Sequence, residues 1–277
     1  MQAISLHSII PVRAEAREGA EQNTQILFGE TCSIVENEQS KAERRWRYVR
    51  LDLDGQEGWV DAKMITPMTD EEYASYKQAY EQASMVAFPM TYAVSENNGQ
   101  TIPLTAGTRL TNYKEGRFEV LGVGFRIDPN MVLTQPKELN EQNLLQTVRF
   151  FLNTPYLWGG KNAMGMDCSG FTQIILGLFG KHLLRNASEQ ATQGTPVADL
   201  AQAKAGDLAF FNHEGLNDGV ANPTKITHVG IVIDPTRVIH CSGRVKVEKL
   251  DSTGIYNIEQ GGYSHHLASI ISSESLL

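Results

Sequence analysis

The sequence predicts an α+β protein in which two small β-barrels precede a larger domain of helices followed by strands. The N-terminal part of the chain carries short apolar runs separated by Gly, Asn and Asp turns, which is the pattern of small barrels. From about Gln135 onward, apolar residues recur first at helical spacing and then in strand-like runs. Helices followed by strands are typical of an α+β domain.

Composition and charge argue against several classes of protein. The chain has 277 residues, enough for two or three small domains, with 41% apolar and 20% charged residues, as in ordinary globular proteins. The net charge of −8 disfavours nucleic acid as a partner, because phosphates need clustered Lys and Arg. The one basic cluster alternates with apolar residues and indicates the solvent face of a strand: Lys41, Arg44, Arg45, Arg47 and Arg50. No run approaches the roughly 18 apolar residues of a membrane span.

The cysteines and the N-terminus bear on the cellular compartment. Three cysteines, Cys32, Cys168 and Cys241, with no Cys-x-x-Cys pair, argue against a disulfide framework and a structural zinc site. The first residues lack a charged start and a sustained apolar stretch, so they do not resemble a secretory signal. We therefore expect a cytoplasmic protein; the alternative is an exported protein whose signal was removed.

Residues 1–67 are predicted as the first barrel and residues 68–84 as a linking helix. The strand-like runs of the barrel lie at 26–30, 46–49 and 55–60. Thr69 can cap the helix. The acidic residues that follow it favour the positive end of the helix dipole, and they are Asp70, Glu71 and Glu72.

Residues 85–136 carry a fainter copy of the barrel pattern. Leu104, Gly107 and Leu110 echo Leu27, Gly29 and Cys32, and residues 117–120 echo 45–49. The period of about 80 residues is too long for a solenoid. Two SH3-like barrels would account for the repeat, and a coincidence of two β-rich segments is the alternative.

The last predicted domain, 137–277, begins with two helical patterns. In the first, five apolar residues share a face: Leu144, Leu145, Val148, Phe151 and Leu152. In the second, Phe171, Ile174, Ile175 and Leu178 follow the spacing of an amphipathic helix. Beyond Gly206, strands are predicted at 208–211, 228–233 and 238–240.

Cys168 stands where the second helix is expected to begin. Asp167 is a suitable N-cap, which places Cys168 in the first turn. There the helix dipole favours the thiolate, the nucleophilic form of cysteine. A buried and inert cysteine is the alternative.

A nucleophile needs a base, and two of the seven histidines lie in strand-like runs twelve residues apart. A turn at Asp234-Pro235 would make the two strands antiparallel neighbours, so that His228 can take the Cys168 proton while His240 fixes its tautomer. Each histidine alone could also be an ordinary strand residue. We expect the histidines in polar contexts at the surface, namely His182, His213, His265 and His266, and assign no role to His7.

Four ordered motifs resemble the signature of the NlpC-type peptidases, whose catalytic domain is papain-like. They are Asp167-Cys168-Ser169-Gly170-Phe171, Ala205-Gly206-Asp207-Leu208-Ala209-Phe210-Phe211, His228-Val229-Gly230-Ile231 and Ile239-His240. The resemblance covers roughly Gln135 to the C-terminus. It implies Cys168 as nucleophile, His228 as base and His240 as the residue that orients the base.

The resemblance also implies substrate-binding residues. In Pro155-Tyr156-Leu157-Trp158-Gly159-Gly160, Tyr156 would help the Cys168 backbone N–H to hold the oxyanion, and Trp158 would line the cleft. Ordinary aromatic packing is the alternative for both. Asp167, Ser169 and Ser188 match the residues that bind a free N-terminal amine, although Asp167 could serve as a cap alone.

The barrels resemble those of the subgroup that trims murein peptides as dipeptidyl-peptidases. This implies a monomer that cleaves the γ-D-glutamyl–L-diamino-acid bond of murein stem peptides with a free L-Ala, through a thioester and without a cofactor, a metal or a membrane partner. Three positions depart from the subgroup, because Leu184, Asn186 and Gln56 replace its usual Pro, Asp and Tyr. An amidase or acyltransferase on the same fold, and a non-enzymatic wall-binding module, are the alternatives.

Overall fold

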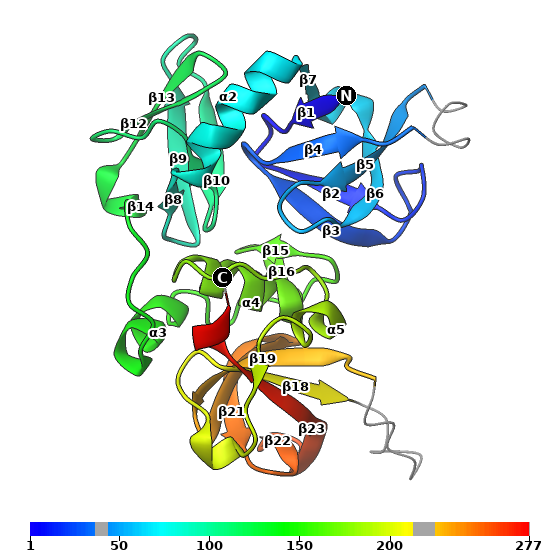
Figure 1. Cartoon of the computed structure of the whole chain (residues 1–277), viewed down its shortest axis with the longest axis vertical. Coiled ribbons are helices and arrows are strands. Elements are labelled where there is room, and N and C mark those ends of the chain that lie inside the picture. Colours follow the sequence, from blue (N-terminus) through cyan, green and yellow to red (C-terminus); the bar gives the residue numbers. More distant parts are fainter. Residues whose placement is uncertain (37–43, 213–224, 277) are drawn as a thin grey trace. The chain divides into compact units, whose positions relative to one another are not determined.

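The structure is a computed structural model that describes residues 1–36, 44–212 and 225–276. The chain forms two compact units (Figure 1). The first comprises Met1–Gln135 and Trp158–Ala163, and the second comprises Pro136–Leu157 and Met164–Leu277. The units therefore do not follow chain order throughout, because a short segment just before Cys168 belongs to the first unit.

The first barrel is an antiparallel sheet with the order β3-β2-β6-β5-β4-β1-β7. Along β2 the buried residues Ile10 and Val12 alternate with half-buried neighbours, as expected for a strand with one face on a core. Cys32, Val49 and Val60 belong to the same core. The strands are β1 Gln2–Ile4, β2 Ile9–Arg13, β3 Gln22–Leu27, β4 Thr31–Ile34, β5 Trp46–Leu51, β6 Glu57–Asp61 and β7 Thr66–Met68, with a 3₁₀ turn, η1, at Ala62–Met64.

The predicted helix is present as α2, Asp70–Glu81, and begins as expected at Thr69. The Thr69 hydroxyl accepts from the Glu72 N–H, and the Glu72 carboxylate accepts from the Thr69 N–H. This reciprocal capping box satisfies two backbone donors that the first helical turn cannot pair internally. The buried face of α2 carries Tyr76, whose hydroxyl donates to the Gly29 carbonyl at 2.8 Å.

The second barrel comprises a sheet with the order β10-β9-β13-β12 and another with the order β11-β8-β14. The predicted repeat has a conformational counterpart, because Gly29 and Gly107 both follow a strand and both have a positive φ, 80° and 84°, which glycine adopts without strain. The elements are β8 Ser84–Val86, β9 Met90–Ser95, β10 Thr101–Thr105, β11 Arg109–Leu110, β12 Arg117–Val120, β13 Val123–Ile127, η2 Pro129–Met131 and β14 Val132–Leu133.

A buried apolar cluster, separate from the core of the first barrel, joins both barrels and α2. Phe28 of the first barrel packs edge-on against Phe125 and Phe118 of the second, with ring centroids 5.5 and 6.4 Å apart. Tyr76 and Met68 belong to the same buried cluster. The two barrels are therefore joined by buried apolar contacts as well as by the connecting helix.

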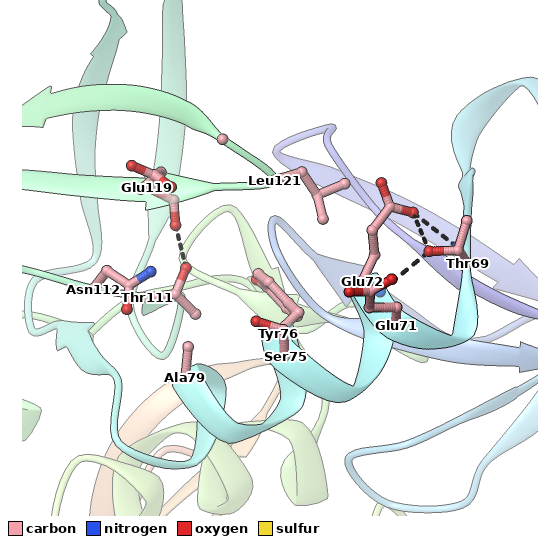
Figure 2. Close-up of a pocket in the computed structure, with 11 residues that line it drawn as sticks. Thr69, Glu71, Glu72, Ser75, Tyr76, Ala79, Thr111, Asn112, Glu119 and Leu121 are labelled. Carbon is pink, nitrogen blue, oxygen red and sulfur yellow. Dashed lines mark hydrogen bonds between the residues drawn. The ribbon is translucent and has the colours of Figure 1, made fainter.

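A hollow of about 570 Å³ lies between α2 and the second barrel (Figure 2). Several of the polar groups that line it have partners within the protein: Glu72 belongs to the capping box, and the Thr111 hydroxyl donates to the Glu119 carbonyl. The Tyr76 hydroxyl likewise donates to the Gly29 carbonyl. We assign this hollow a packing role.

The segment Trp158–Ala163, which contains β15 Lys161–Asn162, is held in the first unit by a buried ion pair. Lys161 is fully buried, and its Nζ lies 2.8 and 2.9 Å from the two carboxylate oxygens of Glu30. Gln25 accepts from the Lys161 backbone N–H and from the Asn162 amide. At Gly159, with φ 70°, an added Cβ would lie 2.3 Å from the Gln22 carbonyl oxygen, so the close approach of the two backbones requires glycine.

The second unit is built on an antiparallel sheet with the order β17-β23-β18-β19-β20-β21-β22. Because β22 also pairs with β23, the strands from β18 to β23 close into a six-stranded barrel. The predicted strands are confirmed as β18, β19 and β20. The bounds are β16 Gly165–Met166, β17 Thr195–Pro196, β18 Leu208–Asn212, β19 His228–Asp234, β20 Arg237–Ser242, β21 Arg244–Leu250, β22 Gly254–Asn257 and β23 Gly262–Ser272, with 3₁₀ turns η3 Leu200–Gln202 and η4 Ser273–Ser275.

Both predicted helices of this unit are present but differ from expectation. α3, Glu141–Val148, ends before Leu152, which is 42% exposed, because the chain leaves the helix and turns through Asn153 with φ 66°. α4, Cys168–Gly177, was expected to be amphipathic, yet every residue from Cys168 to Leu176 is buried. A third helix is the short α5, Ala187–Gln190. The helices in the described ranges are too short or too polar to cross a membrane.

Replacing Lys161 with Met should lower the free energy of unfolding of the first unit by about 3–5 kcal/mol, because Glu30 would remain as a buried and unpaired carboxylate. All three tryptophans belong to this unit, so urea unfolding followed by tryptophan fluorescence reports on it. The double variant Lys161→Met/Glu30→Gln should recover most of the loss. Arg17→Gln, which breaks an exposed pair with Glu15, is the matched control and should change little. A Lys161→Met protein as stable as the control would contradict the role of the pair.

Candidate active site

Cys168 is the first residue of α4, and Asp167 is its N-cap, as predicted. The Asp167 carboxylate accepts from the Gly170 N–H at 2.7 Å. The Cys168 sulfur accepts hydrogen bonds from the backbone N–H groups of Val229 and Ser169. The side chain is nevertheless almost fully buried, with 7% exposed.

The structure does not show the expected stabilisation of the Cys168 thiolate by the N-terminus of α4. Burial, followed by the charge of the neighbouring Asp167, raises the pKa of the Cys168 thiol to about 11, while the backbone N–H groups and Arg185 act in the opposite direction. The resting residue is therefore a neutral thiol, because desolvation of a charge outweighs the favourable end of the helix. Such a thiol needs a base to become nucleophilic.

The two strand histidines lie next to each other, as predicted. β19 and β20 are antiparallel neighbours, and His228 Nε2 lies 2.7 Å from His240 Nδ1. His240 is fully buried, and its Nε2 lies 2.8 Å from a carboxylate oxygen of Glu248 on β21. The three side chains form a continuous hydrogen-bonded chain across three neighbouring strands.

Gly230 has no room for a side chain beside His240 and Val238. It is the direct cross-strand partner of His240. An added Cβ would lie 3.0 Å from the His240 Cβ and 2.6 Å from the Val238 side chain. The glycine of the His-Val-Gly-Ile motif is therefore required by packing beside the histidine pair.

His265 is a correction to the sequence prediction, which placed it at the surface. It is buried, with 2% exposed, and its ring stacks on His228 with centroids 4.2 Å apart. Its Nδ1 lies 2.8 Å from the Ser264 hydroxyl. The long strand β23 pairs with β18 and β22 and brings this ring against β19. His182 is exposed and His266 half-buried, while His213 lies outside the described residues.

Arg185 is a further buried charge that the sequence analysis overlooked. Its guanidinium makes a bidentate contact with the Asp167 carboxylate, at 2.6 and 3.0 Å, and donates to the Ser169 hydroxyl at 3.0 Å. Paired geometry of this kind fixes both groups. Arg185 therefore holds the two residues on either side of Cys168.

The loop that carries Arg185 is fastened to α4 by glutamine side chains. Gln190 donates to the carbonyls of Ser169 and Leu184 and accepts from the Thr172 hydroxyl. Gln173 donates to the Leu183 carbonyl. Ser188 lies on α5 within this loop and is exposed. Its predicted contact with substrate remains a prediction.

The aromatic residues before Cys168 fall into different units. Tyr156 is half-buried and bridges to Met166. Its pKa is raised, first by burial and then by the proximity of Cys168 and Asp167, so its hydroxyl remains a donor. Trp158 belongs to the first unit and is 60% exposed. Its predicted place in the substrate cleft remains a prediction, as does the effect of Gln56, which lies in the turn between β5 and β6.

Cys241 is unsuited to nucleophilic chemistry. Its thiol donates to the Met166 carbonyl at 3.1 Å, and burial, followed by the nearby Cys168 and Asp167, raises its pKa to about 12. In the part of the chain that the structure describes, no group of three or more His, Cys, Asp or Glu side chains is arranged to hold a metal ion.

Three residues of the site, Arg185, Glu248 and His265, carried only weak sequence signals. Arg185 follows the apolar pair Leu183-Leu184, which is a mild indication of burial for a charged residue. Glu248 lies in a polar–apolar alternation that is typical of a solvent-facing strand. In each case the partner is distant in the sequence or on another strand, so no local pattern distinguishes the residue from a surface one.

Replacing Asp167 with Asn should lower the pKa of Cys168, because the charge that opposes the thiolate is lost while that of Arg185 stays. The alkylation rate of Cys168 by iodoacetamide, followed across neutral and alkaline pH by peptide mass spectrometry, should then rise at lower pH. Asn retains the capping oxygen. Asp199→Asn, the same change at the exposed cap of η3, is the control. An unshifted profile would mean that Asp167 has no electrostatic effect on the thiol.

Comparison with known proteins agrees with this architecture. Residues 153–266 match the NlpC/P60 family, and residues 12–65 match the bacterial dipeptidyl-peptidase Sh3 domain. The chain is 31% identical over 232 residues to a gamma-D-glutamyl-L-lysine dipeptidyl-peptidase of Bacillus subtilis, covering 78% of this chain and 71% of the relative. It is 34% identical over 98 residues to a protein of the same name from Bacillus cereus, covering 35% of this chain and 27% of that relative.

Solved structures show the same fold. A crystal structure of an NlpC/P60 family protein from Bacillus cereus superimposes with a TM-score of 0.77 over 100% of both chains at 19% identity. An NlpC/P60 endopeptidase of Photobacterium damselae subsp. piscicida gives a TM-score of 0.70 at 14% identity, covering 99% of this chain and 73% of that one. The predicted papain-like NlpC domain preceded by SH3-like barrels is thereby confirmed, and the chain belongs to the NlpC/P60 family.

Proposed function

We propose that this protein is a cysteine peptidase that hydrolyses the γ-D-glutamyl–L-diamino-acid bond of murein stem peptides with a free N-terminal L-Ala. One observation carries the proposal: Cys168 begins a buried helix that packs against β19. That strand carries His228, from which a hydrogen-bonded chain runs through His240 on β20 to Glu248 on β21. Family membership supports a cysteine peptidase of the cell wall. The names of the Bacillus relatives support the particular bond.

The first half of the reaction forms a thioester. His228 takes the thiol proton of Cys168, and the sulfur attacks the γ-carbonyl carbon of the D-glutamyl residue. The resulting oxyanion is held by the Cys168 backbone N–H, which is free to donate because it opens the helix, and by the protonated hydroxyl of Tyr156. When the intermediate collapses, the C–N bond breaks and protonated His228 passes its proton to the leaving amine.

The second half returns the free enzyme. Water gives a proton to His228 as it attacks the thioester carbonyl, and the C–S bond breaks. The sulfur leaves as a thiol after taking that proton back from His228. The products are the L-Ala–D-Glu dipeptide, now with a free γ-carboxylate, and the peptide that begins with the diamino acid.

Asp167, Ser169 and Ser188 would bind the free amine of L-Ala. Asp167 and Ser169 flank the nucleophile, which would bring an ammonium bound there close to the cleaved bond. Arg185 already pairs with both oxygens of Asp167. The arginine thus holds the carboxylate in a fixed orientation, and the substrate ammonium would add a charge-assisted hydrogen bond to a preorganised group.

Replacing Cys168 with Ala should reduce kcat on L-Ala–γ-D-Glu–diamino-acid peptides by more than about 10³-fold, because removing the nucleophile of a serine peptidase costs about 10⁶-fold. Product release is followed by chromatography. Cys241→Ala and Cys32→Ala are the matched controls and should keep their activity. A Cys168→Ala protein with full activity would refute the proposed mechanism.

Acetylating the N-terminus of the same peptide should lower kcat/KM by about 10- to 10²-fold, since a hydrogen bond to a charged group contributes about 1.5–3 kcal/mol. A peptide extended at the far side of the cleaved bond keeps the free amine and is the control. Undiminished turnover of the acetylated peptide would remove the amine-binding role of Asp167 and leave the peptidase assignment intact.

A further inference from the structure

Glu248 is a buried carboxylate for which the mechanism above has no role. On β21 it shares a face with Lys246, two residues earlier, and it lies diagonally across from His240, whose direct partner is Lys246. The Glu248 side chain is only 8% exposed. A carboxylate this buried is costly unless it is paired.

Both partners of Glu248 contact the same oxygen. Its Oε2 lies 2.8 Å from His240 Nε2 and 3.1 Å from Lys246 Nζ. Although burial acts in the opposite direction, the hydrogen bond from His240 and the hydrogen bond and charge of Lys246 lower the pKa of Glu248. Glu248 is therefore ionised at neutral pH and can only accept hydrogen bonds.

An acceptor at this position determines which ring nitrogen of His240 and of His228 carries the hydrogen. His240 Nε2 must carry a hydrogen to bond with Glu248. Burial lowers the pKa of His240, so the ring is neutral and its Nδ1 is an acceptor. The 2.7 Å contact with His228 Nε2 then requires His228 to donate from Nε2, which leaves Nδ1 as its only basic nitrogen.

Ionisable groups on the neighbouring elements also face this hydrogen-bonded chain. On β20 the ring involved is His240 itself, and on β23 the His265 ring stacks on His228, with its Nδ1 directed to the Ser264 hydroxyl. From α4 the neighbour is the neutral thiol of Cys168, which contacts the N–H of Val229, the residue after His228. Lys246 is the nearby cation and contacts Glu248.

We propose that Glu248 is a positioning residue that fixes the tautomers of His240 and His228, so that His228 Nδ1 carries the lone pair that accepts the Cys168 proton. Without it, His240 can carry its hydrogen on Nδ1 and donate to His228 Nε2. His228 would then hold its proton on Nδ1 and present no lone pair to the thiol. This inference rests on the proposed roles of Cys168 and His228.

The test compares Glu248→Gln with Glu259→Gln, a control that removes an exposed carboxylate paired with Arg244. Glu248→Gln should lower kcat about 10²-fold with little change in KM, since an amide permits the wrong tautomer, whose cost in a serine peptidase reaches about 10⁴-fold. Alkylation of Cys168 at neutral pH should fall in parallel. Unchanged kcat and alkylation in Glu248→Gln would overturn the proposal.

A second measurement uses the wild-type protein, so its outcome does not depend on whether a variant folds. In the wild-type protein labelled with ¹⁵N-histidine, NMR should show His240 and His228 both protonated at Nε2 near neutral pH. A proton on Nδ1 of either ring would overturn the proposal. The alkylation and NMR readouts need no substrate. If Cys168→Ala cleaves normally, the peptidase mechanism fails; if only Glu248→Gln behaves as wild type, the positioning role alone fails.

Discussion

The pairing of Asp167 with Arg185 is the interaction on which the geometry of the site depends. One carboxylate caps α4 through the Gly170 N–H, binds both guanidinium nitrogens of Arg185, and lies beside the Cys168 thiol, whose pKa it raises. A buried carboxylate can do this only because its charge is compensated by an equally buried arginine. The helix start, the loop before α5 and the residues flanking the nucleophile are thus held by a single ion pair.

The barrel of the second unit supplies the other half of the site. Neighbouring antiparallel strands set His228, His240 and Glu248 at hydrogen-bonding distance, and the strand register decides which side chains face each other. Gly230 leaves room for the His240 Cβ and the Val238 side chain, and the His265 ring stacks on that of His228. Cys168 is a neutral thiol at rest, so its reactivity depends on this base. The strand pairing therefore positions this base as well as building the core.

The first unit also contains a buried ion pair. A fully buried lysine, Lys161, is compensated by Glu30, and this pair fastens the segment that immediately precedes the second unit's Cys168 region in the chain. The shared core around Phe28 joins both barrels and α2. In both units, a buried charge that would be too costly in free energy without a partner forms an ion pair between separate segments of the sequence.

The sequence alone determined the α+β class, the two barrels, the Thr69 cap, the Asp167 cap and the proximity of His228 and His240, because capping, alternation and a tight turn act over a few residues. It did not disclose that α4 is buried all round or that α3 ends before Leu152. Glu248 and Lys161 have the local pattern of surface residues, Arg185 has only a mild indication of burial from the apolar pair before it, and His265 lies in a polar stretch. Only tertiary structure decided their burial, because each depends on a partner from another segment, and pairing between distant segments leaves no local periodicity.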